Sequence, residues 1–259
     1  DRFPLIKPDI IKVDRSITSN IQDDYYKQEI FRSLVKLSRK IGTLVLAEGV
    51  ETEAEVLTVL NCDADLLQGF FFARPAATWE VLHGEVGDKV RIMADRLRES
   101  RIGHITRLRS QIRLYDETID RMTSVLSTAR PDEFMERLAP CLADFPFIEA
   151  VYVLDGQGVM VTDTMLQPAA EKRLEKLFRK AVKGDDLSLK EYFYLLMFSG
   201  LKHYVTESYT SLATGNLTRT ISSHFIDSMG KLYVLCIDVL GDLSPSAAGK
   251  GFERLQFGS

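Results

Sequence analysis

Strand-like and helix-like segments alternate through the first part of the sequence, and this alternation restricts the fold more than any other feature. Residues 8–14, 43–48 and 65–72 are short apolar runs that predict strands. Residues 25–40 and 54–60 repeat apolar side chains at helical spacing. Strands that alternate with helices over short connections indicate parallel strands with helices packed outside. We therefore predict an α/β fold for this part of the chain.

Two acidic residues, Glu48 and Glu51, follow the second predicted strand. Thr52 and Glu55 then have the spacing of a capping box, so a helix is expected to begin there. Barrels of the α/β class place their chemistry at the carboxyl ends of strands, and Gly49 allows a close approach of the backbone. The stretch is a candidate for metal binding or proton transfer. A strand-to-helix turn with two solvated acids has the same local pattern.

Composition excludes several function classes. The net charge of −4 argues against nucleic-acid binding and against a polybasic membrane surface. No apolar run approaches the roughly 20 residues that cross a bilayer. Cys62, Cys141 and Cys236 are far apart in apolar surroundings, so we expect reduced core cysteines in a cytoplasmic protein. The chain opens at Asp1 without methionine or a signal peptide, which predicts a piece of a longer protein.

Residues 84–129 predict one long helix. Its apolar positions recur at steps of three and four residues, and they are Val86, Val90, Met93, Leu97, Ile105, Leu108, Ile112, Tyr115, Ile119, Met122 and Leu126. The repeat slips between Leu97 and Ile105, where Gly103 weakens the helix and marks a candidate bend. The helix either pairs with its twin in a homodimer or lies on its own domain, because both arrangements bury the same residues.

The last segment, residues 130–259, combines predicted strands with turn signals. Helices are predicted from Pro131 to about Ala143 and over 174–182. Strands are predicted at 147–154, 159–162, 204–207, 216–223 and 231–239. Residues 190–200 are strongly apolar and fit either a helix or a buried edge strand. The segment predicts a five- or six-stranded antiparallel sheet flanked by helices.

Three ordered blocks in the first segment resemble the last three signature blocks of the EAL family. They are Lys12-Val13-Asp14, then Ala47-Glu48-Gly49-Val50-Glu51-Thr52, then Gln68-Gly69-Phe70-Phe71-Phe72-Ala73-Arg74-Pro75. The resemblance covers about residues 1–83 and implies part of a TIM-like (β/α) barrel. It also implies a bacterial phosphodiesterase that hydrolyses cyclic-di-GMP to linear pGpG with two Mg²⁺ or Mn²⁺ ions.

The resemblance implies catalytic roles for three residues. Lys12 would orient the attacking water and hold phosphate charge. Glu48 would act as the general base or anchor the metal-bound water, and Gln68 would complete the site. A two-metal site needs convergent carboxylates for the hard cations and a cation to balance the phosphate.

Four further positions take supporting roles by the same resemblance. Asp14 would join Glu48 in the metal and water network, and Glu51 would anchor the loop that carries metal ligands. Phe70 and Arg74 would contact the substrate. The family's earlier blocks, which supply most of the metal ligands, are absent from this sequence. We therefore expect that the ligands lie upstream of Asp1 and that this chain alone is inactive.

The last segment resembles the PAS-like or Cache-type sensor domains that follow some EAL domains. The resemblance lies in residues 204–218 and 233–238. It implies a pocket for a small ligand between the sheet and a helical lid. The candidate lining residues are Tyr152, Tyr204, Tyr209, Thr214 and Arg219. Cross-strand packing is the other explanation for these tyrosines.

The sequence therefore predicts three parts. They are the carboxyl-terminal portion of an EAL barrel (1–83), a long signalling helix (84–129) and a PAS-like or Cache-type antiparallel sheet domain (130–259). The fold class is α/β plus α+β. The leading hypothesis is a dimeric cyclic-di-GMP phosphodiesterase regulated by its sensor domain. The alternatives are a non-hydrolysing cyclic-di-GMP receptor and a dimerising sensor module.

Overall fold

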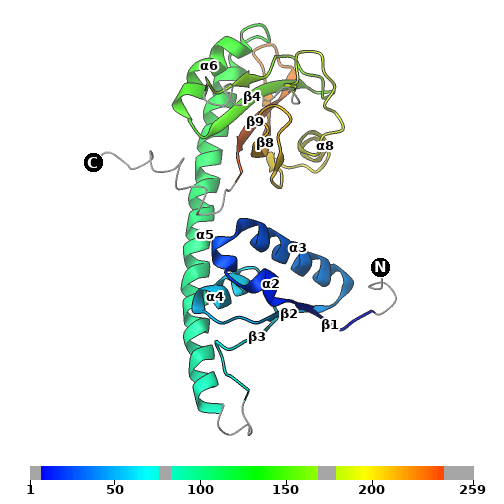
Figure 1. Cartoon of the computed structure of the whole chain (residues 1–259). Helices are drawn as coiled ribbons and strands as arrows, with labels where there is room; N and C mark the ends of the chain where they lie inside the picture. Colours follow the sequence, from blue (N-terminus) through cyan, green and yellow to red (C-terminus); the bar gives the residue numbers. More distant parts are fainter. Residues whose placement is uncertain (1–6, 76–82, 169–178, 242–259) are drawn as a thin grey trace, which may run out of the picture. The chain divides into compact units, whose positions relative to one another are not determined.

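The computed structural model describes residues 7–75, 83–168 and 179–241. The chain divides into two compact units, residues 1–109 and 110–259, which are considered separately below. One helix, α5 (His83–Ser127), begins in the first unit and ends in the second (Figure 1). The predicted long helix over 84–129 is thus confirmed as an unbroken element.

The first unit contains a three-stranded parallel sheet in the order β1-β2-β3. The strands are β1 (Ile10–Val13), β2 (Leu44–Glu48) and β3 (Leu66–Gln68). The other elements are α2 (Arg15–Thr18), the 3₁₀ helix η1 (Ile21–Asp23), α3 (Tyr25–Ile41) and α4 (Glu53–Asn61). The strand–helix alternation and the parallel direction predicted from the sequence are confirmed.

Local sequence signals fix the ends of the two longer helices in this unit. Asp24 caps α3 by accepting a hydrogen bond from the backbone N–H of Lys27, and Gly42 ends it with a φ of 75°. Thr52 and Glu55 form the expected capping box at the start of α4. Left-handed backbone is the conformation that glycine adopts without steric cost.

The two faces of the parallel sheet differ in burial. Val13, Val45 and Ala47 point into a core shared with α3 and α4. Ile10, Leu44 and Leu66 lie on the other face and are 42%, 47% and 39% exposed. Side chains alternate between faces along a strand, so Lys12 and Glu48 share the open face. The candidate catalytic residues therefore stand on the uncovered side of the sheet.

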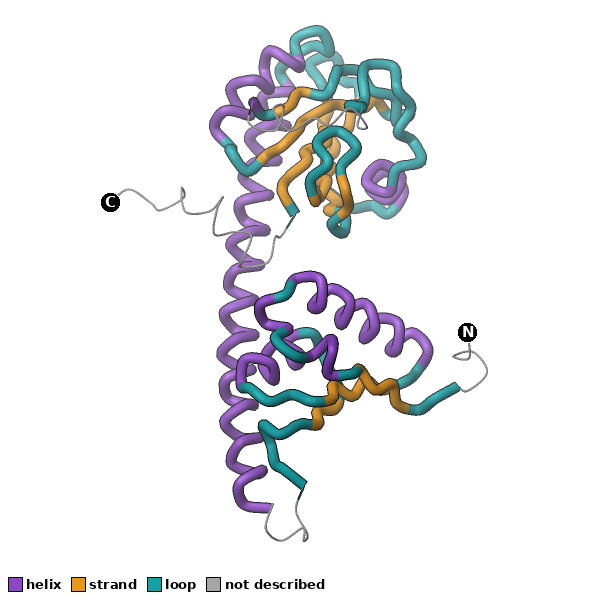
Figure 2. The backbone as a smooth tube through the Cα atoms, viewed as in Figure 1, coloured by secondary structure: helices purple, strands orange, loops and turns teal. Residues whose placement is uncertain are grey.

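The second unit is built on a six-stranded antiparallel sheet, which confirms the predicted strand number and direction. Its order is β5-β4-β9-β8-β6, and β7 pairs with β8. The strands are β4 (Ile148–Asp155), β5 (Met165–Leu166), β6 (His203–Val205), β7 (Tyr209–Thr210), β8 (Leu217–Ile226) and β9 (Leu232–Leu240). The carboxyl-terminal part of α5 packs on one face together with helix α6 (Phe134–Asp144). Helix α8 (Glu191–Phe198) packs on the other face (Figure 2).

Two predictions in this unit need correction, and one open alternative is resolved. Helix α6 begins at Phe134 rather than beside Pro131, because residues 131–133 form a turn. Residues 159–162 are not a continuous strand, but they lie antiparallel to β4 as the predicted hairpin requires. Leu154 and Met160 form an isolated bridge, and the Val161 N–H donates to the Val153 carbonyl at 2.9 Å. The Thr162 hydroxyl accepts from the backbone N–H of Val153, and strand β5 pairs with β4 further on, at 165–166. Residues 190–200, for which two structures were open, contain helix α8.

The predicted helix over 174–182 falls partly outside the described residues, since 169–178 are not described. Its remaining residues, 179–182, are not helical. All three cysteines are free and buried, as expected. Within the described ranges, none of the helices has both the length and the apolar character of a membrane span.

The apolar positions of α5 have different environments along the helix. Met93 is buried in the core of the first unit, and Tyr115, Ile119, Met122 and Leu126 are buried in the second. Between them, Ile105, Leu108 and Ile112 are 48%, 37% and 55% exposed. Part of the predicted seam therefore packs on the helix's own units, whereas these three residues and Val90, which is 50% exposed, do not.

Candidate functional site

The carboxyl ends of β1, β2 and β3 bring together the three residues predicted to be catalytic. The Lys12 ammonium lies 2.6 Å from Glu48 Oε1. Glu48 is in register with Gln68, the last residue of β3. Residues in register on neighbouring strands point to the same side of a sheet. A cation, a carboxylate and an amide thus share one end and one face of the parallel sheet.

Two loops that leave these strands are joined through their backbones. The Val50 N–H donates to the Gln68 carbonyl at 3.2 Å, and the Phe71 N–H donates to the Val50 carbonyl at 3.1 Å. Gly69 sits inside this crossing, where an added Cβ would lie 1.9 Å from the Val50 carbonyl oxygen. Only glycine fits such an approach. The crossing therefore fixes the end of β3 against the loop that follows Glu48.

The first helical turn after β1 holds the loop that carries Glu51. The Arg15 guanidinium lies 2.7 Å from Glu51 Oε2, and the Thr18 hydroxyl donates to the Glu48 carbonyl at 2.6 Å. Asp14 caps this turn, and its carboxylate accepts from the Ser16 N–H at 2.8 Å. Donation from the backbone and hydroxyl of Ser16 lowers the pKa of the Asp14 carboxyl.

Glu55 was expected only to close a capping box, and the structure gives it a wider role. Its buried carboxylate accepts from the backbone N–H groups of Asn20, Glu51 and Thr52 at 2.8 to 3.0 Å. Burial alone raises the pKa of Glu55, but these donors outweigh it and leave the pKa below its ordinary value. Glu55 therefore ties the loop after Glu48 to the turn near Asn20. The spacing from Thr52 indicated the cap but not the contact with Asn20.

The described residues of this site do not make a metal centre by themselves. No group of three or more His, Cys, Asp or Glu side chains in the described ranges is placed to hold a metal ion. Glu48 is paired with Lys12, and one oxygen of Asp14 is used in the helix cap. We therefore derive no metal-dependent step from these residues alone.

The two residues implied as substrate contacts lie just beyond β3 and contact each other. The Arg74 guanidinium carbon is 4.7 Å from the centre of the Phe70 ring. Phe70 is 48% exposed. An arginine stacked on an exposed ring offers both a charge and a flat apolar surface.

The five residues implied as a sensor pocket occupy both faces of the antiparallel sheet. Tyr152 packs edge-on against Tyr192 of α8, with 6.3 Å between the ring centres, and Tyr204 lies on the same face of the sheet. Arg219 lies two residues before Ile221 in β8, so both side chains point to the same face of the sheet. That face packs against α5 and α6. Its Nε donates to the Ser208 hydroxyl at 3.0 Å. The structure therefore brings Tyr152 and Tyr204 to one face and places Arg219 on the other.

Tyr209 and Thr214 belong to hydroxyl networks that end on buried carboxylates. The hydroxyls of Tyr209 and Thr220 are 2.6 Å apart, and Thr220 donates to Asp238 at 2.7 Å. Thr214 donates to Glu149 at 3.3 Å. The hydroxyl of Tyr204 contacts Glu191 instead, and burial followed by that contact raises the pKa of Tyr204 to about 12.

Asp238 is a buried acid that was not among the predicted site residues. It is 5% exposed, and burial raises its pKa to about 7, with a further contribution from Glu149. The donor identified for it is a neutral hydroxyl. An aspartate in the middle of an apolar strand was the signal available in the sequence.

Sequence comparison supports the EAL resemblance for the first part of the chain. The EAL domain family matches residues 1–75. The Bacillus subtilis protein YkuI, described as an uncharacterized EAL-domain containing protein, is 23% identical over 242 residues. That alignment covers 88% of this chain and 56% of YkuI. The cyclic di-GMP phosphodiesterase NbdA of Pseudomonas aeruginosa is 35% identical over 74 residues, which are 29% of this chain and 9% of NbdA.

Structural comparison extends the likeness to the second unit. The crystal structure of YkuI, determined in complex with cyclic-di-GMP and calcium, superimposes with a TM-score of 0.67 at 20% identity. It covers 94% of this chain and 59% of the YkuI chain. At this identity the comparison establishes a shared fold. The chain spans little more than half of YkuI, so its activity is considered as a proposal.

Proposed function

We propose that this chain is part of a bacterial cyclic-di-GMP phosphodiesterase that acts in the cytoplasm, with residues 1–83 as the carboxyl-terminal portion of its EAL barrel. The observation that carries the proposal is the 2.6 Å pair between Lys12 and Glu48, with Gln68 in register beside Glu48. The family match to residues 1–75 and the phosphodiesterase relative NbdA support it. The substrate is therefore a cyclic dinucleotide with two phosphodiester bonds.

The chemistry follows from the charges gathered at the strand ends. Lys12 holds the phosphate charge and orients the attacking water, because an ammonium group next to a phosphodiester offsets its negative charge. Glu48 acts as the general base that takes the proton from that water, or else anchors the water in place. Gln68 fixes the water by hydrogen bonding, and Phe70 with Arg74 binds the base and phosphate of the substrate.

Mg²⁺ or Mn²⁺ would supply the Lewis acid of this reaction, with Glu48 and Asp14 as the contribution of this chain. The described residues contain too few ligands for two ions. Glu51, held by Arg15, would anchor the loop that borders the ions. We therefore expect no hydrolysis by residues 1–259 alone, and activity only in a protein that contributes further carboxylates.

The test is formation of pGpG by the full-length natural protein that contains this chain, with Mg²⁺ present. Replacement Glu48→Gln should reduce kcat/KM by about 100-fold or more. Glu29→Gln on α3 is the matched control and should leave activity unchanged. Absence of pGpG with the unmodified protein would reject the enzyme and favour a receptor that binds cyclic-di-GMP without hydrolysis.

We further propose that residues 130–259 form a PAS-like or Cache-type sensor domain that binds a small ligand, with 84–129 as the signalling helix and 1–83 as the catalytic part. The antiparallel sheet with helices on both faces supports this organisation. The candidate lining residues on the face that packs against α8 are Tyr152, Tyr204 and Tyr209. Thr214, which donates to Glu149, is the remaining candidate. The exposed Ile105, Leu108 and Ile112 support a homodimer through α5.

A further inference from the structure

A basic pocket lies on the first unit, away from the Lys12–Glu48 pair. It has a volume of about 400 Å³ and is lined by Arg32, Val35, Lys36, Arg39, Lys40, Asn61, Cys62 and Asp63. The lining residues come from the second half of α3 and the end of α4. These helix ends precede the amino ends of β2 and β3, whereas Glu48 and Gln68 lie at the carboxyl ends. The pocket is thus at the opposite end of the sheet from the proposed catalytic site.

The charge of the pocket is opposite to that of the chain. Arg32, Lys36, Arg39 and Lys40 face a single lining carboxylate, Asp63, although the whole chain has a net charge of −4. Arg32, Lys36 and Lys40 are spaced four residues apart, so they stack three like charges along one face of α3. Arg32 also pairs with Glu29 within α3.

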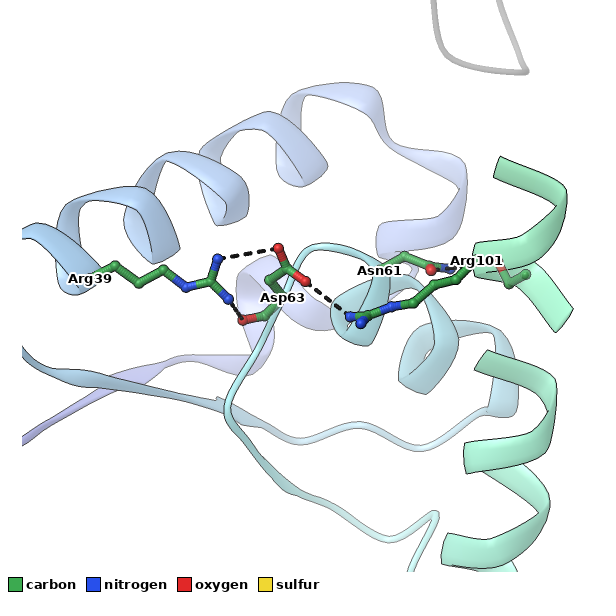
Figure 3. Close-up of polar contacts among 5 residues, drawn as sticks. Arg39, Asn61, Asp63 and Arg101 are labelled. Carbon is green, nitrogen blue, oxygen red and sulfur yellow. Dashed lines mark hydrogen bonds and ion pairs between the residues drawn. The ribbon is translucent and has the colours of Figure 1, made fainter. Parts of the chain in front are cut away.

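Asp63 pairs with two arginines at the edge of this pocket. Arg39 Nη1 lies 3.3 Å from Asp63 Oδ2, and Arg101 Nη2 of α5 lies 3.0 Å from Asp63 Oδ1 (Figure 3). Asp63 has a φ of 65°, a left-handed backbone that presents its carboxylate to both guanidinium groups. Its side chain is about half exposed, so the ion pairs are accessible from solvent.

We propose that this pocket binds a phosphate-bearing small molecule. Guanidinium groups bind phosphate through two parallel hydrogen bonds, and lysines add point charges. Pockets for small molecules usually enclose about 300–1,000 Å³, so the volume is sufficient. Asp63 acts as an internal competitor for Arg39, because it occupies part of the guanidinium that the ligand uses. The proposal does not depend on the phosphodiester chemistry at Glu48.

The test is isothermal titration of the full chain with inorganic pyrophosphate. The double replacement Lys36→Glu/Lys40→Glu should weaken binding by about tenfold or more, since it reverses two charges in the pocket. Asp63→Asn should strengthen binding several-fold, because asparagine tolerates the left-handed backbone and removes the competing charge. Arg107→Glu, an exposed change of the same sign on α5, is the control and should have little effect.

Amide chemical shifts of the unmodified protein give a second measurement that needs no variant. On addition of pyrophosphate, shifts should move in residues 32–40 and 61–63 and stay fixed at Lys12 and Glu48. Absence of binding overturns the proposal. Equal weakening by the Arg107→Glu control, or shifts concentrated near Glu48, also overturns it. Loss of pyrophosphate binding leaves the proposed hydrolysis of cyclic-di-GMP unaffected, so the two failures can be told apart.

Discussion

At the scale of single residues, Glu55 is the acid that organises the loops beside the proposed active site. It accepts three backbone hydrogen bonds from two separate segments while buried. The loop after β2 therefore depends on one carboxylate that takes no part in the proposed chemistry.

Replacing Glu55 by alanine should destabilise the first unit by about 2–3 kcal/mol, because three backbone donors lose a charged acceptor. Hydrogen exchange at the amides of Asn20, Glu51 and Thr52 should accelerate the most. Its lowered pKa makes this stability present above the unfolded pKa and lost as the pH falls through the folded value. Glu29→Ala is the exposed control, and a similar loss in both variants would contradict the assignment.

In the second unit, the stability that depends on Asp238 should change with pH in the opposite direction. Its folded pKa of about 7 lies above the ordinary value of 3.8, so the folded state favours the protonated acid. The associated stability is present in full below about pH 4 and is lost as the pH rises to about 7, at up to about 1.4 kcal/mol per pH unit.

Urea unfolding at a series of pH values tests this dependence. Asp238→Asn, which resembles the protonated acid, should remove the decline in this pH window. Thr220 should keep its hydrogen bond to the asparagine side chain. An unchanged pH profile in Asp238→Asn would show that Asp238 is not the group responsible.

At the scale of elements, Gly69 lets two loops cross beside the site. Gly69→Ala places a Cβ inside the backbone of Val50 and should destabilise the first unit by more than about 2 kcal/mol. Gly87→Ala in α5 is the matched control, since nothing lies within 4 Å of the added Cβ. Alanine favours a helix over glycine by about 1 kcal/mol. The midpoint temperature of thermal unfolding should therefore fall for Gly69→Ala and stay level or rise for Gly87→Ala.

The elements also show what the sequence could and could not predict. The ends of α3 and α4 followed from Gly42 and from the Thr52–Glu55 pattern, because caps are local signals. Residues 159–162 pair with β4 only through an isolated bridge, because the Thr162 hydroxyl, and not a backbone carbonyl, accepts from the Val153 N–H. The basic pocket, the burial of Asp238 and the reach of Glu55 to Asn20 depend on contacts between distant segments. Periodicity along the chain does not encode such contacts.

At the scale of the whole molecule, α5 is the element through which two copies are proposed to associate. Ile105, Leu108 and Ile112 are exposed at the spacing of a coiled-coil seam. Ile105→Lys together with Ile112→Lys should shift a dimer to monomer, because charges at such positions oppose burial. Sedimentation velocity measures the change, and Arg107→Glu is the control. A monomer in the unmodified protein would contradict the proposed dimer.

The proposed function depends on Lys12 and Glu48 acting together on a phosphodiester. The most direct measurement is a double-mutant cycle in kcat/KM for pGpG formation by the full-length protein. Lys12→Met and Glu48→Gln should each reduce kcat/KM by about 100-fold or more, and the double variant should lose little beyond either single one. Losses that multiply, or single variants that retain full activity, would contradict a shared catalytic role for this pair.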